Sequence, residues 1–265
     1  MNSILDKFRV DGQVAIVTGA GRGIGQASAI ALADAGADVV VSARTVSQLE
    51  ETAEQIRQRG RKALVVQCDA TNEEQRQSLV EQIFAEFGRL DILVNNAGGS
   101  GPKSALDTTP EEFNAVLDFN CTSAFAMSRL AAPHMAKTGK GSIVNISSVA
   151  ARFAQPGFAA YGVGKAAMDM LTRNLAQDFA PIVRVNAVAV GTTLTSALEG
   201  FMSDEMEAAM LEHTPLARLG KPEDIAACVL FLASPAADYV SGEIYGVNGG
   251  LARTPVEMPR ANFEI

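Results

Sequence analysis

Tyr161 and Lys165 are the pair of residues whose types and spacing most directly suggest chemistry. They stand four positions apart in Tyr-Gly-Val-Gly-Lys, so on a helix their side chains share a face. A free tyrosine has a pKa near ~10, and a neighbouring ammonium lowers that pKa towards a useful acid–base range. Ser148, thirteen residues earlier, adds a hydroxyl. Taken alone, however, Tyr-x-x-x-Lys occurs on many amphipathic helices, where a purely structural role is the better interpretation.

A glycine-rich segment, Thr18-Gly-Ala-Gly-Arg-Gly-Ile-Gly25, follows the first predicted strand and opens a helix. Its spacing is G-x-x-x-G-x-G rather than the usual G-x-G-x-x-G, but the mechanism is the same. Positions without side chains let backbone N–H groups and a helix N-terminus approach a pyrophosphate. The alternative is a tight turn without a ligand, which the flanking strand and helix disfavour. The candidate nucleotide-binding residues here are Gly19, Gly21, Arg22, Gly23, Ile24 and Gly25.

The end of the second predicted strand bears on the choice of nucleotide. A site for NAD(H) normally carries Asp or Glu there, whose carboxylate accepts the ribose 2′-OH. This strand ends in Ala43-Arg44, and Asp38 lies at its other end. Arg44 can pair with a 2′-phosphate, and Arg22 can add a second cation. The alternative is two solvated surface arginines. The sequence therefore predicts NADP(H), with NAD(H) as the alternative.

Three further candidate segments, Asp69, Asn95 to Gly98 and Asn120, accompany the glycine-rich segment and the Ser148, Tyr161 and Lys165 set. This combination of residues in this order is a specific signal. Taken together, the motifs resemble those of the short-chain dehydrogenase/reductase family, of the classical type, over residues 10–250. The residues that carry the resemblance are Thr18 to Gly25, Asp69, Asn95 to Gly98, Asn120, Ser148, Tyr161 and Lys165.

This resemblance implies a catalytic group of four residues. Tyr161 would exchange the proton with the substrate oxygen, and Ser148 would hydrogen-bond and orient that oxygen. Lys165 would hold the nicotinamide ribose and lower the pKa of Tyr161. Asn120 would anchor a water molecule that completes a proton relay.

The resemblance also extends the nucleotide site. Asp69 would face the adenine, and the backbone around Asn95 would line the ribose. One departure is that the family usually has Pro-Gly after the sixth strand, where this chain has Val190-Gly191. The glycine and the downstream Thr195 remain, so nicotinamide binding is still expected. The remaining candidate cofactor residues are Arg44, Asp69, Ala70, Asn96, Ala97, Gly98, Tyr161, Lys165, Gly191 and Thr193.

The substrate is the least defined part of the prediction. Residues 95–103 and 212–226 are similar to bacterial 7α-hydroxysteroid dehydrogenases. A predicted helix over 195–211 is rich in leucine, phenylalanine and methionine, which suits either an apolar small-molecule substrate or packing on the core. We therefore expect hydride transfer between NADP(H) and a secondary alcohol or ketone, with a hydroxysteroid or another apolar substrate. A 3-oxoacyl-carrier-protein reductase and an NADP(H)-binding regulator without turnover are the alternatives.

Strands and helices alternate along the whole chain and would position these residues. Apolar, β-branched runs predict strands, and apolar residues at three- and four-residue spacing predict helices. This pattern indicates one α/β domain, 1–250, with a Rossmann-type, doubly wound, seven-stranded parallel sheet flanked by helices. The tail, 251–265, is either a frayed end or an arm on a neighbouring subunit. The strands are expected at 14–17, 38–41, 63–66, 92–94, 142–146, 183–188 and 243–247, and the helices at 24–35, 46–59, 73–87, 111–137, 158–179, 195–211 and 222–233.

Composition excludes several other classes of function. The formal net charge of -8 argues against a nucleic-acid binder and gives no support to a partner as acidic as a carrier protein. Neither a secretory signal nor a run of about 18 apolar residues is found, so no membrane span is expected. Three dispersed cysteines and two distant histidines predict a reducing, cytoplasmic compartment and no metal. The resemblance implies a homotetramer that pairs through the helices at 111–137 and 158–179 and through the last strand.

Overall fold

Seven parallel strands form one sheet in the computed structural model, which describes residues 3–195, 198, 200 and 202–252. The strand order is β3-β2-β1-β4-β5-β6-β7, and every neighbouring pair is parallel. This confirms the doubly wound sheet predicted from the sequence. The strands are β1 (Val14–Thr18), β2 (Asp38–Ala43), β3 (Ala63–Gln67), β4 (Ile92–Asn95), β5 (Gly141–Ser148), β6 (Val183–Val190) and β7 (Ile244–Val247).

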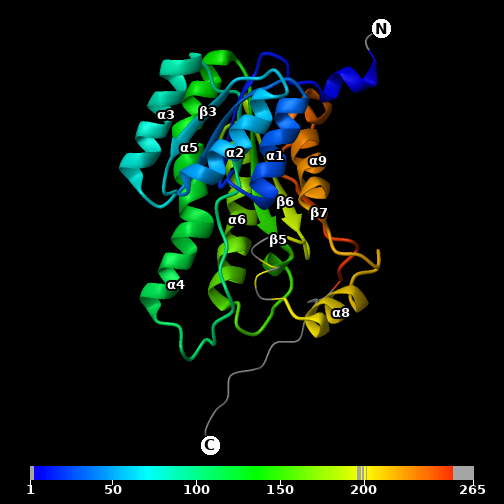
Figure 1. Cartoon of the computed structure of the whole chain (residues 1–265). Helices are drawn as coiled ribbons and strands as arrows, with labels where there is room; N and C mark the ends of the chain where they lie inside the picture. The colour runs from blue at the N-terminus through cyan, green and yellow to red at the C-terminus, as the bar shows by residue number, and fades with distance from the viewer. Residues whose placement is uncertain (1–2, 196–197, 199, 201, 253–265) are drawn as a thin grey trace, which may run out of the picture.

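Helices cover both faces of the sheet (Figure 1). On one face α1, α2 and α9 pack on the strands, and on the other α3, α5 and α6 do so. Successive residues of a strand point to opposite faces, so in β1 Val17 packs under the first group and Ile16 under the second. The helices are α1 (Gly23–Asp34), α2 (Val46–Arg57), α3 (Glu73–Phe87), α4 (Pro110–Leu117), α5 (Ser123–Thr138), α6 (Ala159–Asp178), α8 (Asp204–Glu212) and α9 (Pro222–Ala233).

Two of the predicted helices differ from the structure. The helix expected over 111–137 is divided, because a π-helical turn at Asp118–Thr122 separates α4 from α5. The helix expected over 195–211 is also wrong as a single element. Residues 202 and 203 are not helical, and the Ser203 side chain accepts a hydrogen bond from the Met206 N–H as α8 begins. Part of that range, and the tail from residue 253 on, lie outside the described residues.

A crevice is expected between the carboxyl ends of β1 and β4. The chain runs outward from β1 through β2 to β3 and then returns to β4, and ligands bind where the winding of such a sheet reverses. The loops that follow β1, β4 and β5 all lie at this lower edge in Figure 1. Within the described ranges, no helix is long and apolar enough to cross a membrane.

Candidate active site

Thr18, at the end of β1, ties the glycine-rich loop to the loop after β4. Its Oγ1 accepts hydrogen bonds from the N–H groups of Asn96 and Ala97, both at 3.0 Å. The Asn96 side-chain amide donates in return to the carbonyls of Thr18 (2.9 Å) and Gly19 (3.1 Å). Six polar groups are thus paired within two neighbouring loops, which fixes the shape of the crevice before any ligand enters.

The glycines of this crevice stand where a side chain would collide with the protein. A Cβ on Gly25 would overlap the Gly19 carbonyl oxygen and lie 2.5 Å from the Asn96 amide nitrogen. Gly19 and Gly23 have φ angles of +64° and +57°, which side chains rarely adopt. The α1 N-terminus begins at Gly23 and faces the same space. A cradle of this kind, with open N–H groups and a helix N-terminus, fits a pyrophosphate.

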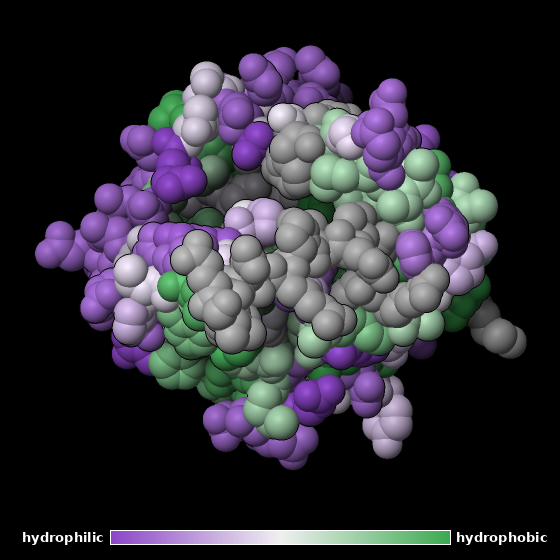
Figure 2. Space-filling model, turned by 90° about the horizontal axis from the view of Figure 1, so that it is seen from below, coloured by the Kyte–Doolittle hydropathy of each residue, from purple (hydrophilic) through white to green (hydrophobic). Residues whose placement is uncertain are grey.

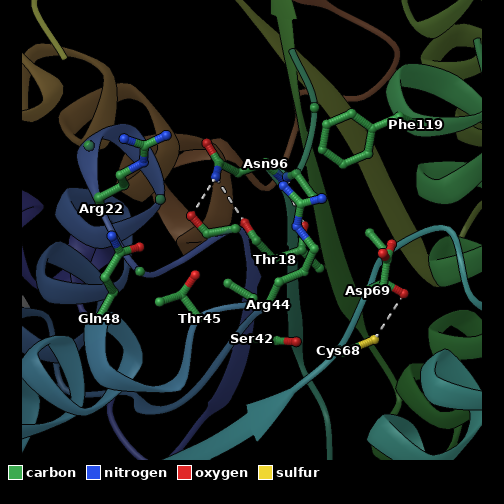
Figure 3. A pocket seen from close by; sticks show the side chains of 18 of the residues that line it. Thr18, Arg22, Ser42, Arg44, Thr45, Gln48, Cys68, Asp69, Asn96 and Phe119 are labelled. Atoms are coloured by element: carbon green, nitrogen blue, oxygen red, sulfur yellow. Dashed lines mark hydrogen bonds between the residues drawn. The ribbon is translucent and has the colours of Figure 1, made fainter. Parts of the chain in front are cut away.

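A cavity of about 470 Å³ occupies the crevice. Figure 3 shows side chains from the glycine-rich loop, β2, β3 and the loop after β4 around it. Its lining includes twelve of the candidate nucleotide-binding residues, Gly19, Gly21, Arg22, Gly23, Ile24, Gly25, Arg44, Asp69, Ala70, Asn96, Ala97 and Gly98. Thr195 also lines it. Gly191 and Thr193 do not, and Gly191 packs instead against Asn248, whose Cα would lie 2.5 Å from an added Cβ.

Arg44 extends into the cavity from the residue after β2 (Figure 3). Its guanidinium makes no ion pair with any residue that the structure describes. Asp38 lies at the opposite end of β2, where it pairs with Arg61 at 2.8 Å and accepts a hydrogen bond from the Lys62 N–H. Asp38 is therefore remote from the cavity, and the strand end next to the cavity carries a cation and no acid.

Ser148, Tyr161 and Lys165 come together where β5 meets α6. The Ser148 and Tyr161 side chains are hydrogen-bonded, and the Lys165 Nζ lies 5.7 Å from the centre of the Tyr161 ring. Lys165 is only 4% exposed, and its Nζ donates to the Ile146 carbonyl at 2.8 Å. Gly98 connects this group to the cavity, because a Cβ there would lie 3.1 Å from the Lys165 Nζ.

The electrostatics of this group differ from the sequence prediction. Burial raises the pKa of Tyr161, and the hydrogen bond with Ser148 opposes that effect. Burial lowers the pKa of Lys165 to about 8, while Cys121 and Asp169 oppose that shift. The expectation that Lys165 lowers the pKa of Tyr161 is therefore not met here. The physical reason is desolvation, which disfavours the charged form of both groups.

Asn120 lies in the π-helical turn and is fully buried. Its Oδ1 accepts from the Gly99 N–H at 2.8 Å, and its Nδ2 donates to the carbonyls of Gly99 (3.1 Å) and Val116 (2.9 Å). The side chain thus holds the loop after β4 against the helix that precedes α5. It lies close to Lys165, because both flank the position of a Cβ on Gly98. The predicted water-anchoring role of Asn120 stays a prediction.

Several residues of the cavity lining were not predicted from the sequence. They share no motif, because they come from separate strands, helices and loops that packing brings together. Arg76 is the one with an available signal, since it occupies an apolar position of α3 together with Leu79, Val80 and Ile83. The unpredicted lining residues are Ser42, Thr45, Gln48, Cys68, Arg76, Leu79, Phe119 and Met127.

A family model described as enoyl-(acyl-carrier-protein) reductase matches residues 19–252. A 7α-hydroxysteroid dehydrogenase of Escherichia coli K12 is 44% identical over 246 residues, which cover 92% of this chain and 96% of the relative. The chain belongs to the short-chain dehydrogenase/reductase family. It is accordingly an NAD(P)-dependent oxidoreductase.

Solved structures of this family have the same fold. A 7α-hydroxysteroid dehydrogenase complexed with NADH and 7-oxoglycochenodeoxycholic acid matches with a TM-score of 0.91 and 44% identity, over 94% of this chain and 98% of its own. A gluconate 5-dehydrogenase of Burkholderia cenocepacia, in complex with NADP and tartrate, matches with a TM-score of 0.89 and 33% identity, over 94% and 98%. Members with this fold therefore occur in complex with either dinucleotide.

Proposed function

We propose that this short-chain dehydrogenase/reductase transfers a hydride between NADP(H) and a secondary alcohol or ketone, with Tyr161 as the proton-transferring residue. The observation that carries the proposal is the arrangement around Gly98. On one side of it lies the cavity that fits a dinucleotide, and on the other lies the Lys165 ammonium beneath the Tyr161 ring. A substrate oxygen next to Tyr161 would therefore lie beside the nicotinamide end of the cofactor.

Each member of the catalytic group has a separate task in this proposal. When bound, the nicotinamide supplies or accepts the hydride. The Tyr161 hydroxyl donates its proton to the substrate oxygen during ketone reduction and accepts it back during alcohol oxidation. Ser148, which already hydrogen-bonds Tyr161, orients the substrate oxygen. Lys165 holds the ribose, and Asn120 anchors a water that relays the proton.

The preference for NADP(H) over NAD(H) rests on the end of β2. Ala43 supplies no carboxylate to accept a ribose 2′-OH or to repel a 2′-phosphate. Arg44 follows it, extends into the cavity and is well placed for charge-assisted hydrogen bonds to a phosphate. Because a relative of the same fold is complexed with NADH, the nucleotide must be tested on this chain itself.

Calorimetric titration of Arg44→Ala with both nucleotides tests this preference. We expect the wild-type enzyme to bind NADP(H) at least about tenfold more tightly than NAD(H). Arg44→Ala should weaken NADP(H) by roughly 1.5–3 kcal/mol, typical of a charge-assisted bond, and leave NAD(H) nearly unchanged. Arg57→Ala, an exposed arginine on α2, is the matched control. Equal affinities of the wild-type enzyme for the two nucleotides would contradict the assignment.

For the substrate we propose an apolar secondary alcohol or ketone, with hydroxysteroids as the first class to test. The 7α-hydroxysteroid dehydrogenases of Escherichia coli K12 and Clostridium sardiniense are 44% and 42% identical to this chain, and hydrophobic side chains form part of the face seen in Figure 2. A net charge of -8 gives less support to an acidic carrier-protein substrate. A panel of steroid, alicyclic and acyl ketones, assayed with NADPH, decides between them. Turnover of acyl thioesters alone would favour the 3-oxoacyl-carrier-protein reductase.

We also propose that the enzyme is a homotetramer. Apolar side chains on the outer faces of α5 and α6 support pairing there, since Phe125, Val163 and Met170 are 43%, 48% and 53% exposed. The mass measured by light scattering decides this. The cytoplasmic location and the domain limits, 1–250 with a tail of 251–265, stay predictions.

A further inference from the structure

Arg76 is a buried arginine inside the cofactor cavity. It belongs to the first turns of α3, is 7% exposed and lines the cavity together with Cys68, Asp69 and Leu79. Its Nη1 donates to the Ala70 carbonyl at 2.6 Å, which fixes the guanidinium against the carboxyl end of β3. A charged, largely buried group therefore forms part of the cavity wall.

The guanidinium of Arg76 is poorly satisfied in its present surroundings. Its Nε is buried without a hydrogen-bond partner, and the bond to Ala70 is the single one that its side chain makes to the described residues. Asp69, the neighbouring acid, does not form an ion pair with it. The Asp69 Oδ1 instead accepts from the N–H and the hydroxyl of Thr71, at 2.9 and 2.7 Å. A buried, unpaired cation costs stability unless a ligand compensates for it.

The position of Arg76 relative to the sheet indicates which part of the ligand compensates for its buried charge. Strand order places β3 two strands from β1, on the side away from β5 and Tyr161. A dinucleotide with its nicotinamide beside Tyr161 and its pyrophosphate on the glycine-rich loop therefore extends its base towards β3 and α3. A guanidinium stacks well on an aromatic base and donates readily to ring nitrogens.

We propose that Arg76 binds the adenine base, the part of the dinucleotide that NAD(H) and NADP(H) share. This inference rests on the proposed function only in requiring that a dinucleotide occupies the cavity. Its task differs from that of Arg44, which is exposed and follows β2, where the 2′-phosphate is expected. Arg76 is a buried residue of α3 and is hydrogen-bonded to Ala70, so it contributes to the binding of NADP(H) and NAD(H) alike.

Calorimetry with NADP⁺ and NAD⁺ on the whole enzyme separates the two arginines. Arg76→Leu, which matches the apolar residues of its own helix face, should weaken both nucleotides by the same factor of about ten. Arg44→Ala should weaken NADP⁺ alone. Arg57→Leu, on the exposed face of α2, controls for the loss of a positive charge. A loss confined to NADP⁺ in Arg76→Leu, or a change below about twofold for both nucleotides, would overturn the proposal.

A spectroscopic measurement observes ligand binding on the wild-type protein itself and uses a conservative variant for assignment alone. The buried Nε–H of Arg76, assigned by its absence in Arg76→Lys, should give a distinct ¹⁵N resonance. That resonance should shift on addition of adenosine 2′,5′-bisphosphate and of adenosine 5′-monophosphate, and should not shift with pyrophosphate. No shift with either adenine compound overturns the inference. Failure of the wild-type enzyme to bind any dinucleotide would instead reject the proposed function together with it.

Discussion

At the nucleotide end of the crevice, Thr18, Asn96 and Gly25 are held together by short hydrogen bonds and direct packing. At the substrate end, the loop around Lys103 is held by one backbone hydrogen bond to Gly157 and by an exposed ion pair with Glu112. Lys165 lies next to Gly98 at the border of the nucleotide cavity, and Tyr161 lies beside Lys165. One end is thus held by several contacts between two loops, and the other by one backbone hydrogen bond and one exposed ion pair.

This difference explains why similarity to relatives indicates the cofactor more reliably than the substrate. A pyrophosphate is recognised by N–H groups and a helix N-terminus, which many members of a family can share without sharing a substrate. Substrate recognition depends on loop side chains, which change without disturbing the sheet. The chain's resemblance to its relatives is therefore strong evidence for the cofactor type and weaker evidence for the substrate.

The largest effect is expected for Tyr161→Phe, which should separate chemistry from nucleotide binding. The substitution keeps the ring but removes the transferable proton, so turnover should fall by about 10²–10⁴-fold. Nucleotide affinity, measured by calorimetry, should stay at the wild-type value, because the cavity lining does not include Tyr161. Tyr239→Phe, at a fully exposed tyrosine, is the control. Retention of more than about a tenth of wild-type kcat, with chemistry rate-limiting, would assign the proton to another group.

Lys165→Met tests the buried charge where the two ends meet. Because burial lowers the pKa of Lys165 from 10.5 to about 8, the unfolded chain binds more protons than the folded chain between these pH values. Wild-type stability should therefore rise with pH across this window, by at most about 3 kcal/mol, relative to Lys165→Met. Below about pH 8 the full cost of the buried ammonium is present, and it vanishes as pH approaches 10.5.

Urea unfolding of both proteins across this pH range measures the effect. For Lys62→Met, at an exposed lysine, the difference in free energy of unfolding from the wild-type protein should stay constant across this pH range. If that difference were constant for Lys165→Met as well, the Lys165 pKa would be the same in the folded and unfolded chains.

Gly25→Ala should damage the nucleotide end selectively. An added methyl group would overlap the Gly19 carbonyl and press on the Asn96 amide, so the glycine-rich loop must move. We expect the affinity for either dinucleotide to fall by about 10–100-fold, which corresponds to the usual cost of overpacking. Gly101→Ala is the matched control, because nothing lies within 4 Å of its added Cβ. Unchanged affinity in Gly25→Ala, measured by calorimetry, would show that the loop is compliant.

Most of the fold could be predicted because local patterns determine it. Buried, β-branched runs located all seven strands, and their alternation with helices indicated the doubly wound sheet. The π-helical turn was not predicted from helical spacing, and its residue Asn120 makes hydrogen bonds to Gly99, 21 residues away in the chain, which local spacing does not reveal. The start of α8 had a local signal, because Ser203 followed by acidic residues is typical of a helix N-terminus.

The site was predicted unevenly for the same reason. Glycines around a turn can be recognised by their type and spacing, so the glycines that line the cavity could be named from the sequence, and their binding of a nucleotide stays a prediction. Arg76 was missed because its inward direction follows from the packing of α3. The direction of the Tyr161 pKa shift was also missed, because desolvation depends on surroundings that only the folded chain provides.

Lys103→Ala should have the smallest effect and tests the substrate end. The Lys103 Nζ lies 2.6 Å from both carboxylate oxygens of Glu112, which also completes the capping box of α4 with Thr109. Both side chains are 47% exposed, and exposed ion pairs contribute little to folding because water and salt screen them. The midpoint of unfolding and the dinucleotide affinity should therefore stay within error of the wild-type values. Hydrogen exchange in the loop before α4 should nevertheless accelerate, while exchange in the glycine-rich loop should not. The control is Lys140→Ala, an exposed lysine outside this loop that has no ion pair among the described residues. If exchange accelerated equally in both loops, the two ends would open together, and the distinction between a preformed nucleotide end and an adaptable substrate end would fail.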